Sequence, residues 1–437
     1  MDIAFAPVTK LAHWVKHHQL TSERLTRIYL ERLKQFGPKL ECVVTLTQDL
    51  ALEQARQADR EIAAGRYRGP LHGIPWGAKD LFDTAGIPTT WGAAPYRDRV
   101  PETDAVVVKK LRQAGAVLVA KLTLGALAYG DVWFGGKTRN PWNPKQGSSG
   151  SSAGPAAATA AGLVGFSLGT ETYGSIVSPS MRCGTTGLRP TFGRVPRTGA
   201  MALSWSMDKV GPITRTVEDA SIVLHAIQGR DDGDPASIDA PYLYDASHPV
   251  RNRRLGFSPA WFKADHANDI DRDALQAARD LGMNLVEIEL PDWPFDSLAA
   301  LVGIEAAAAF EQLTLTGRDE QLIRQDVNAW PNIFRQARLV SAVDFVQLQR
   351  FRRQVMTMMD ERFQIVDAML SPSFAASMLL ITNMTGHPCL VLRAGFVHDQ
   401  PHGVTLWGRL FEEGALCEIG RALEHRLAVW DRRPELT

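Results

Sequence analysis

The chain has 437 residues with 48 basic and 48 acidic side chains, so its formal net charge at neutral pH is zero. This balance gives no electrostatic attraction to nucleic acid or to an anionic membrane, and we expect neither as a partner. The cysteines contain no CxxC pair and are widely scattered, which favours neither a metal site nor a disulfide framework: Cys42, Cys183, Cys389 and Cys417. We therefore expect a reduced, cytoplasmic setting.

Two apolar segments are candidates for targeting or membrane signals. The N-terminal MDIAFAPVTKLAHW has an acid at position 2 and no basic segment before an apolar run, which is unlike a signal peptide. The most apolar segment, residues 153–168, is interrupted by glycine, proline and serine and is too short to span a membrane. Both observations predict a soluble globular chain.

The first half of the chain predicts alternating helices and short strands. Residues 22–36 have a helical apolar stripe, in which we expect Ser22 to cap the start and Gly37-Pro38 to mark the end. Further along we predict a helix over 50–64, a looped or extended segment at HGIPWGAKDLFDTAG, a helix over 105–114 and a buried strand over 116–120. This alternation continues to about residue 225 and favours an α/β layered sheet.

The second half begins with a polar segment rich in Pro and Asp, residues 229–252, which predicts a long surface excursion. Afterwards the sequence predicts strands at 254–258, 285–290, 366–372, 388–394 and 403–408, and helices at 271–281, 303–315, 335–363 and from Glu412. There is no internal repeat. The economical interpretation is one α/β domain over residues 1–437 with a more helical insertion around 290–365.

The stretch QGSSGSSAGPAAATAAG, residues 146–162, has the composition of a flexible linker. Its context opposes that interpretation, because Pro155 suits a first helical turn and a run of alanines follows. A helix made almost only of small residues is expected to be buried at close quarters. We therefore predict a tightly packed backbone here.

Two catalytic or binding motifs are possible in this region and its neighbours. Gly136-Lys137-Thr138 imitates the end of a phosphate-binding loop, but Asp131 stands where the first glycine is required and prolines follow. Gly150-Ser151-Ser152-Ala153-Gly154 matches the nucleophile elbow G-x-S-x-G around Ser152, with His387 or His402 as the base. NPWNPKQGSS does not predict the strand that an elbow needs, so this hypothesis is disfavoured.

A third arrangement combines a lysine with two serines. Lys79 stands in the mostly apolar IPWGAK, and a desolvated lysine has a lowered pKa and can act as a base at neutral pH. A second small-residue turn, Gly174-Ser175, follows the serine-rich stretch. Lysine and two serines form a proton relay without histidine, a variant of the nucleophile-and-base arrangement.

These segments together resemble the amidase signature family, the Ser-cisSer-Lys hydrolases. The resemblance covers most of the chain and is densest between residues 71 and 220. It rests on LHGIPWGAKDLFDTAGIPTT, GAVLVAKLT, NPWNPKQGSSGSSAGPAAATAAGLVGFSLGT, ETYGSIVSPSMRCGTTGLRPTFGRVPRTG, SMDKVGPITRTVEDA and NMTGHP. It implies a large twisted mixed β-sheet core surrounded by α-helices, and an insertion at 290–365 that covers the substrate.

The resemblance implies a role for each residue of the relay. Ser175 is the nucleophile, Ser151 the relay serine and Lys79 the base, and the Gly150-Ser151 peptide bond is cis or nearly so. Backbone N–H groups of Thr172, Tyr173, Gly174 and Ser175 would form an oxyanion hole. Ser152 supports the site through a hydrogen bond or simply caps a helix. The chemistry needs neither a metal nor a cofactor.

The chain departs from the family pattern D-x-G-G-S-I-R in ETYGSIV. Tyr173 replaces a glycine, and Val177 replaces the arginine that pairs with the acid. We therefore expect Glu171 to find another partner or to remain solvated. Ala153 and Pro155 also depart from the family's GGSSGGS, and all four differences weaken any inference about substrate.

The expected activity is that of a free-standing amidase acting on a small apolar or aryl amide through an acyl-enzyme, alone or as a homodimer. Carbamates and esters share the tetrahedral chemistry. The other branch of the family considered is the A subunit of the glutamine-dependent tRNA amidotransferase, but GAVLVAKLTLGALAYG lacks that branch's acidic residues. Five aromatic residues are candidates for an apolar pocket: Trp76, Trp133, Tyr173, Trp330 and Phe334.

Overall fold

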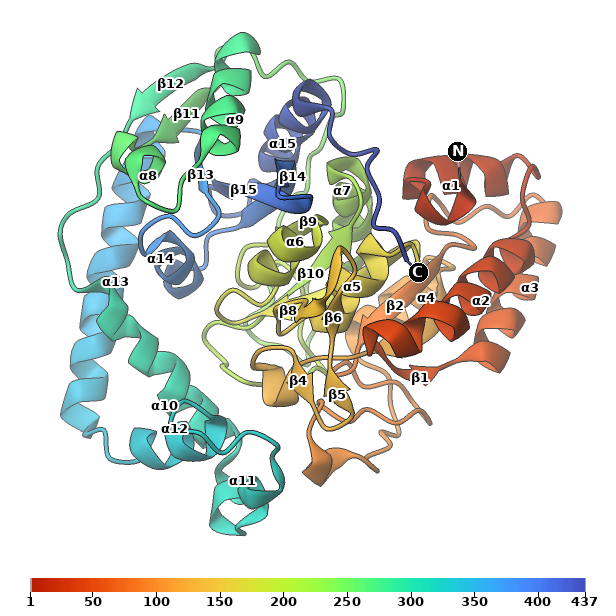
Figure 1. Cartoon of the computed structure of the whole chain (residues 1–437), viewed down its shortest axis with the longest axis horizontal. Helices are drawn as coiled ribbons and strands as arrows, with labels where there is room; N and C mark the ends of the chain where they lie inside the picture. The colour runs from red at the N-terminus through yellow and green to blue at the C-terminus, as the bar shows by residue number, and fades with distance from the viewer. Residues whose placement is uncertain (1, 437) are drawn as a thin grey trace.

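The structure is a computed structural model of the whole chain, and it describes residues 2–436. Within those residues one eleven-stranded sheet forms the centre, in the order β1-β3-β2-β8-β10-β9-β14-β15-β13-β11-β12 (Figure 1). Its strands are β1 (Val43–Leu46), β2 (Pro75–Lys79), β3 (Val117–Leu122), β8 (Phe166–Glu171), β9 (Thr186–Arg189), β10 (Lys209–Thr214), β11 (Arg254–Phe257), β12 (Asn284–Glu287), β13 (Ala368–Pro372), β14 (Cys389–Val397) and β15 (Gln400–Gly408).

The sheet is mixed, as expected. β2 runs parallel to both β3 and β8, and β11 runs parallel to β12 and β13. The remaining pairs are antiparallel, including β8 with β10 and β14 with β15. Two small two-stranded ribbons lie apart from it: β4 (Val132–Trp133) with β5 (Gly136–Lys137), and β6 (Arg139–Asn140) with β7 (Asn143–Gly147).

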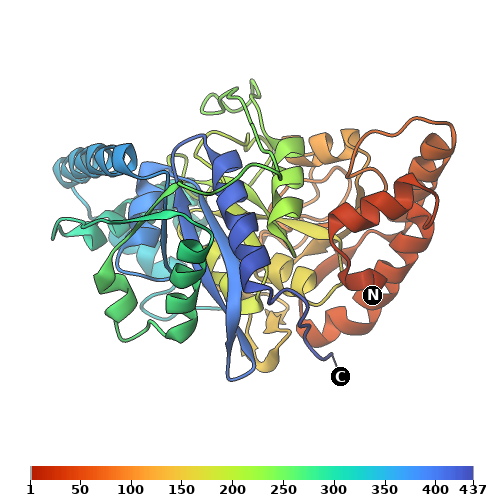
Figure 2. The same ribbon diagram turned by 90° about the horizontal axis from the view of Figure 1, so that it is seen from above.

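Helices pack on both sides of the sheet (Figure 2). They are α1 (Val8–Lys16), α2 (Ser22–Leu40), α3 (Gln48–Ala63), α4 (Val106–Gln113), α5 (Ala153–Ala160), α6 (Val177–Cys183), α7 (Val217–Ile227), α8 (Pro259–Lys263), α9 (Asp269–Asp280), α10 (Ala299–Ala309), α11 (Glu311–Leu315), α12 (Trp330–Ala337), α13 (Ala342–Ile365), α14 (Met378–Thr385) and α15 (Glu413–Leu427). Short 3-10 helices are η1 (Ile3–Phe5), η2 (Ala94–Tyr96), η3 (Ala126–Ala128), η4 (Phe295–Leu298) and η5 (Arg318–Gln321). Among the described residues, no helix is long and apolar enough to cross a membrane.

The ends of α2 differ from the prediction. Thr21, not Ser22, is the N-cap, and its hydroxyl accepts a hydrogen bond from the backbone N–H of Arg24. Pro38 lies inside the last turn, and the helix ends where Glu41 adopts a left-handed conformation. Ser22 instead donates its hydroxyl to the carbonyl of Gly73 at 2.8 Å, so its side chain ties α2 to the segment before β2.

The region between residues 290 and 365 contains η4, α10, α11, η5, α12 and α13 and contributes no strand to the main sheet. Figure 1 shows these helices as an arm beside the central strands, with α13 running along its outer side. α10 packs against α12, and α13 packs against α14 and η4. The first of these contacts places two helices opposite the carboxyl end of β8, where the candidate site lies.

Candidate active site

Lys79 is the last residue of β2, and its amino group ends inside the protein with no exposed surface. Nζ lies 2.8 Å from Ser151 Oγ, 3.1 Å from Ser152 Oγ and 2.9 Å from Thr170 Oγ1. All three hydroxyl oxygens can accept a hydrogen bond from an ammonium group, and none carries a charge. Burial lowers the pKa of Lys79 to about 7, although the negative charges of Asp208 and Glu171 act in the opposite direction. The amine is therefore available as a base near neutral pH.

Strand register brings these groups together. β2 and β8 are parallel with Ala78 opposite Leu168, so Lys79 and Thr170 both lie at the carboxyl end of the sheet. Ser152 bridges the two strands' ends because its hydroxyl donates to the carbonyl of Thr170 at 3.1 Å and accepts from the N–H of Thr170 at 3.2 Å. Ser152 is thus a hydrogen-bond partner within the cluster and makes no side-chain capping bond to α5.

The serine-rich stretch is a tightly packed backbone, as predicted, and every residue of α5 behind it is buried. The Gly150-Ser151 peptide bond is cis. A Cβ added at Gly150 would lie 1.9 Å from the carbonyl oxygen of Gly130, so only glycine fits at this position. Ser149 is held by its N–H to the carboxylate of Asp131 at 3.0 Å and by its hydroxyl to Ser178 at 2.7 Å.

Ser175 lies in the turn between β8 and α6, and Glu171 fixes that turn from below. One carboxylate oxygen of Glu171 accepts from the N–H groups of Ile176 at 2.8 Å and Val177 at 2.9 Å. The N–H groups of Tyr173, Gly174 and Ser175 find no acceptor among residues 2–436. Gly174 has a φ of 87°, a left-handed conformation that favours glycine, and this bend turns the three N–H groups out of the sheet's ladder.

The partner of Glu171 is Arg189, at the end of β9. Arg189 Nη1 lies 2.6 Å from Glu171 Oε1, and both side chains are fully buried. Asn383 from α14 donates to the same oxygen at 2.8 Å. Burial alone would raise the pKa of Glu171, but Arg189 and the N–H of Val177 outweigh it, so the pKa is lowered. The carboxylate left without the family's arginine at Val177 is therefore neither solvated nor unpaired.

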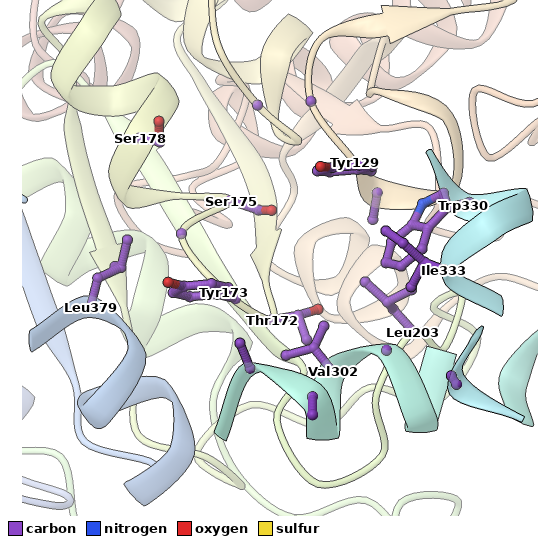
Figure 3. A pocket seen from close by; sticks show the side chains of 18 of the residues that line it. Tyr129, Thr172, Tyr173, Ser175, Ser178, Leu203, Val302, Trp330, Ile333 and Leu379 are labelled. Carbon is purple, nitrogen blue, oxygen red and sulfur yellow. The ribbon is translucent and has the colours of Figure 1, made fainter. Parts of the chain in front are cut away.

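Ser175 opens into the largest cavity described, with a volume of about 710 Å³. Figure 3 shows its hydroxyl projecting into the space between Tyr173 and Tyr129, with Trp330 and Ile333 farther in and Leu379 on the opposite side. α10 forms another wall, with Val302 and neighbouring small residues. No Asp, Glu, Lys or Arg lines this cavity. Its polar groups are hydroxyls, one amide side chain and backbone.

Comparison with known proteins gives this geometry its family. The family model described as Amidase matches residues 24–417. The chain belongs to the amidase signature family. It is 34% identical to a chain of the glutamyl-tRNA(Gln) amidotransferase of Chloroflexus aurantiacus, the A subunit, over 95% of this chain and 96% of that protein. It also resembles the solved peptide amidase of Stenotrophomonas maltophilia, with 30% identity, 99% and 98% coverage and a TM-score of 0.87.

A bacterial aryl acylamidase of the amidase signature family shares the fold, with a TM-score of 0.88 at 23% identity and coverage of 98% and 97%. Membership in the amidase signature family makes the chain an enzyme that hydrolyses C–N bonds of amides. The enzymes of this family act on small amide substrates. Among residues 2–436, no cluster of three or more His, Cys, Asp or Glu suits a metal ion.

The elbow hypothesis is not supported by the geometry of this amidase. Contrary to the expectation, a short strand, β7, does precede the serine-rich stretch, but it pairs only with β6 and stands outside the main sheet. His387 bonds to Thr385 and stacks on Phe363, while His402 bonds to Asp271. The hydroxyl of Ser152 is engaged by Lys79 and Thr170 instead.

The aromatic prediction was right for two of its five members. Tyr173 and Trp330 line the cavity, whereas Phe334 is fully buried behind Trp330 and stacks on it with ring centroids 5.1 Å apart. Trp76 belongs to the core and stacks on Phe166, and Trp133 packs against Phe134. An aromatic residue in a sequence does not reveal which face of its element will be enclosed.

Sequence reasoning missed two polar side chains beside the cluster. Thr170 contacts Lys79 directly, and Asp208 accepts hydrogen bonds from Thr172 Oγ1 and from the N–H of Leu203. Thr170 stands between Gly169 and Glu171 in a strand, so nothing in its sequence context distinguished it from an ordinary strand threonine. Asp208 lies in SMDKVGPI, a segment that the family resemblance included without assigning it a role.

Proposed function

We propose that this chain is a free-standing amidase that hydrolyses small apolar or aryl amides through a Lys79–Ser151–Ser175 relay. The observation that carries the proposal is the 2.8 Å contact of a fully buried lysine amine with Ser151 Oγ. A neutral amine in this position can take a proton from a serine hydroxyl, which an exposed ammonium with an ordinary pKa does not do.

The reaction proceeds in two stages. Neutral Lys79 takes the proton of Ser151, and Ser151 takes the proton of Ser175 as Ser175 Oγ attacks the amide carbonyl. N–H groups of the turn Thr172-Tyr173-Gly174-Ser175 stabilise the resulting oxyanion. The C–N bond then breaks, Ser151 returns a proton to the leaving amine, and water hydrolyses the acyl-enzyme by the reverse sequence of proton transfers.

The lining of the cavity supports an uncharged substrate. Free glutamine carries an ammonium and a carboxylate group at neutral pH, and desolvating both without charged partners costs several kcal/mol per ion. The cavity beside Ser175 offers hydroxyls and apolar surface and no charged side chain. Its walls fit an aliphatic or aromatic group better than an amino acid, and this disfavours a role in a glutamine-dependent amidotransferase.

The helical segment between residues 290 and 365 is proposed to cover the bound substrate. α10 contributes Val302 and Ile304 to the cavity, and α12 contributes Trp330 and Ile333. These helices supply apolar wall without supplying any member of the relay. Substrate choice and bond cleavage would then be carried by separate parts of one domain.

Labelling with a fluorophosphonate probe tests the relay. Peptide mass spectrometry is expected to find the adduct on Ser175 in the wild type, and to find none in Ser175→Ala or Lys79→Ala. An adduct on Ser152 that survives Lys79→Ala would overturn the assignment. The isolated chain is then assayed against aryl amides, aliphatic amides, carbamates, esters and glutamine. Hydrolysis of the amides by the chain alone supports the proposal, whereas release of ammonia from glutamine alone contradicts it.

A further inference from the structure

A second cavity, of about 270 Å³, lies between the end of α6, β14 and the segment that follows α15. We call it the arginine cavity, because four of its lining residues are Arg215, Arg393, Arg432 and Arg433. Asp431 is the one acidic residue among them. The arginine cavity shares no lining residue with the cavity at Ser175.

The two outer arginines already have carboxylate partners. Arg432 lies 3.1 Å from Asp399, and Arg433 lies 3.7 Å from Asp2. Both are partly exposed, so these pairs are weak and readily rearranged. The outer arginines alone would not define a binding site.

The two inner arginines differ, because neither has a carboxylate within 4 Å among residues 2–436: Arg215 and Arg393. Arg393 makes a single hydrogen bond, from Nη1 to the carbonyl of Arg432 at 3.1 Å. Arg215 uses its terminal nitrogens for backbone carbonyls, including Val164 at 2.8 Å and Ala6 at 2.9 Å. In both side chains Nε is buried without an acceptor in the described chain.

The charge on Arg393 is poorly compensated. Burial lowers its pKa to about 10, with Asp431 and Glu424 offsetting only part of that effect. Burial also raises the pKa of Glu424 to about 8, so this carboxyl is mostly protonated at pH 7 and provides little negative charge. A cavity that holds a guanidinium in this state gains free energy when an anion enters it.

Aromatic side chains fix the orientation of Arg393. Its Cζ lies 5.8 Å from the ring centroid of Trp142 and 5.2 Å from that of Phe396. Trp142 is itself anchored by its indole N–H to the carbonyl of Cys183 at 2.9 Å. Stacking of this kind holds the planar group in place and leaves its edge free for two parallel hydrogen bonds, the geometry that carboxylates and phosphates accept.

We propose that the arginine cavity binds a small carboxylate or phosphate anion. Arg393 is its principal ligand, through the nitrogens that have no partner in the chain, and Arg432 closes the outer side. The volume suits a phosphate ion or a short carboxylate rather than a nucleotide. The site is separate from the hydrolytic chemistry, since it lies at the end of α6 remote from Ser175.

Isothermal titration calorimetry at constant ionic strength tests the site, with inorganic phosphate and acetate as separate probes and chloride as the balancing salt. The wild type is expected to bind at least one probe with a stoichiometry of one. Arg393→Gln is expected to weaken this binding by about tenfold or more, because a charge-assisted bidentate contact is lost. The probe that binds more tightly identifies the anion as a phosphate or a carboxylate.

Arg350→Gln is the matched control, because Arg350 is an exposed arginine on α13 whose Nη1 bonds only Gln347 at 3.1 Å. It should leave the affinity unchanged. Arg432→Gln, at an exposed position, provides a second test that does not depend on folding of the Arg393 variant, and a severalfold weaker affinity is expected. Absence of saturable heat with both probes, or equal affinity in wild type and both cavity variants, overturns the proposal.

Discussion

Arg189 and Glu171 form a fully buried ion pair, with 2.6 Å between Nη1 and Oε1, directly beneath the turn that carries Ser175. The other carboxylate oxygen of Glu171 receives the N–H groups of Ile176 and Val177 at the start of α6. The pair therefore connects β9 to the turn and holds the turn's backbone. Removing one partner leaves an uncompensated charge in the core.

Arg189→Met is expected to lower the free energy of unfolding by about 3–5 kcal/mol, the cost of leaving one buried charge unpaired. Urea denaturation at pH 7 measures this loss. Arg338→Met is the control, because it breaks the exposed pair with Glu311 at 3.1 Å and should cost less than about 1 kcal/mol. Similar small losses in both variants would show that Glu171 does not depend on Arg189.

The acidic side of the pH–rate profile should report Lys79. Because the neutral amine is the active form and its pKa is about 7, kcat/KM is expected to rise with pH and to level off above about 7. Lys79→Arg should be inactive at every pH, since a guanidinium stays charged. A profile that is flat from pH 5 to 9, both values being about two units from the pKa, would contradict the base role.

Stability should change with pH for the same reason. An unfolded lysine has a pKa of about 10.4, so between about pH 7 and 10 the unfolded state binds a proton that folded Lys79 does not. The contribution of this lysine to stability is complete above the unfolded pKa and is lost as the pH falls towards 7. Compared with Lys79→Met, the wild type should gain about 1.4 kcal/mol per pH unit in this window. Taking the difference removes the contribution of other titrating groups.

The sequence located the site well because each part is a local signal. A lysine in an apolar strand, two small-residue turns and an alanine-rich helix can all be recognised within a few residues, and the structure places Lys79, Ser151 and Ser152 in contact. The mixed sheet followed from the resemblance. What failed needed distances between segments.

Arg189 shows why. In the sheet order β8-β10-β9, a whole strand separates it from Glu171, and its long side chain reaches across. No periodicity or spacing in the sequence encodes which strand lies between two others. The cap of α2 failed for a different reason: Ser22 is a suitable cap, but its hydroxyl is used in tertiary contact with Gly73 and Thr21 takes the role.

Thr170→Val should change how Lys79 titrates. The Thr170 hydroxyl accepts from Lys79 Nζ at 2.9 Å and so favours the charged amine. Valine removes this acceptor at similar volume, and the pKa of Lys79 should fall further. The acidic limb of the pH–rate profile is then expected to move to lower pH, with a lower plateau because the amine is less well oriented. A purely structural role for Thr170 would lower the plateau and leave the limb in place.

Glu305 on α10 joins the cavity wall to the loop behind the Ser175 turn. Its carboxylate accepts from Ser204 Oγ at 2.6 Å and from Ser206 Oγ at 2.5 Å. The N–H of Ser204 in turn donates to Asp208 at 2.9 Å, which also binds Thr172. The loop between the two carboxylates carries Leu203, a residue of the cavity wall.

Glu305→Ala is therefore expected to raise KM severalfold for bulky amides and to change kcat little, because it loosens the wall without removing any member of the relay. Steady-state kinetics with one bulky and one small amide measures the difference. Glu311→Ala, at an exposed position on α11, should leave both constants unchanged. A loss confined to kcat would mean that Glu305 acts on the chemistry rather than on the wall.

Gly303 offers a direct test of the cavity as the substrate site. It lines the cavity on α10, and a Cβ added there would meet only Ile333 Cγ2, at 3.3 Å. Gly303→Leu should therefore fold, and loss of a helix-interior glycine even favours the helix by up to about 1 kcal/mol. The leucine side chain fills part of the 710 Å³ beside Ser175.

If apolar substrate groups occupy this space, Gly303→Leu should raise KM for bulky aryl amides by about tenfold or more, the equivalent of excluding one or two methylene groups. Small aliphatic amides should be unaffected, because they need only the volume next to Ser175. Ala308→Leu is the control, since Ala308 is exposed on the same helix and does not line the cavity. Equal losses on bulky and small amides would place the substrate elsewhere, whereas a selective loss makes the width between α10 and α12 a determinant of which amides this enzyme accepts.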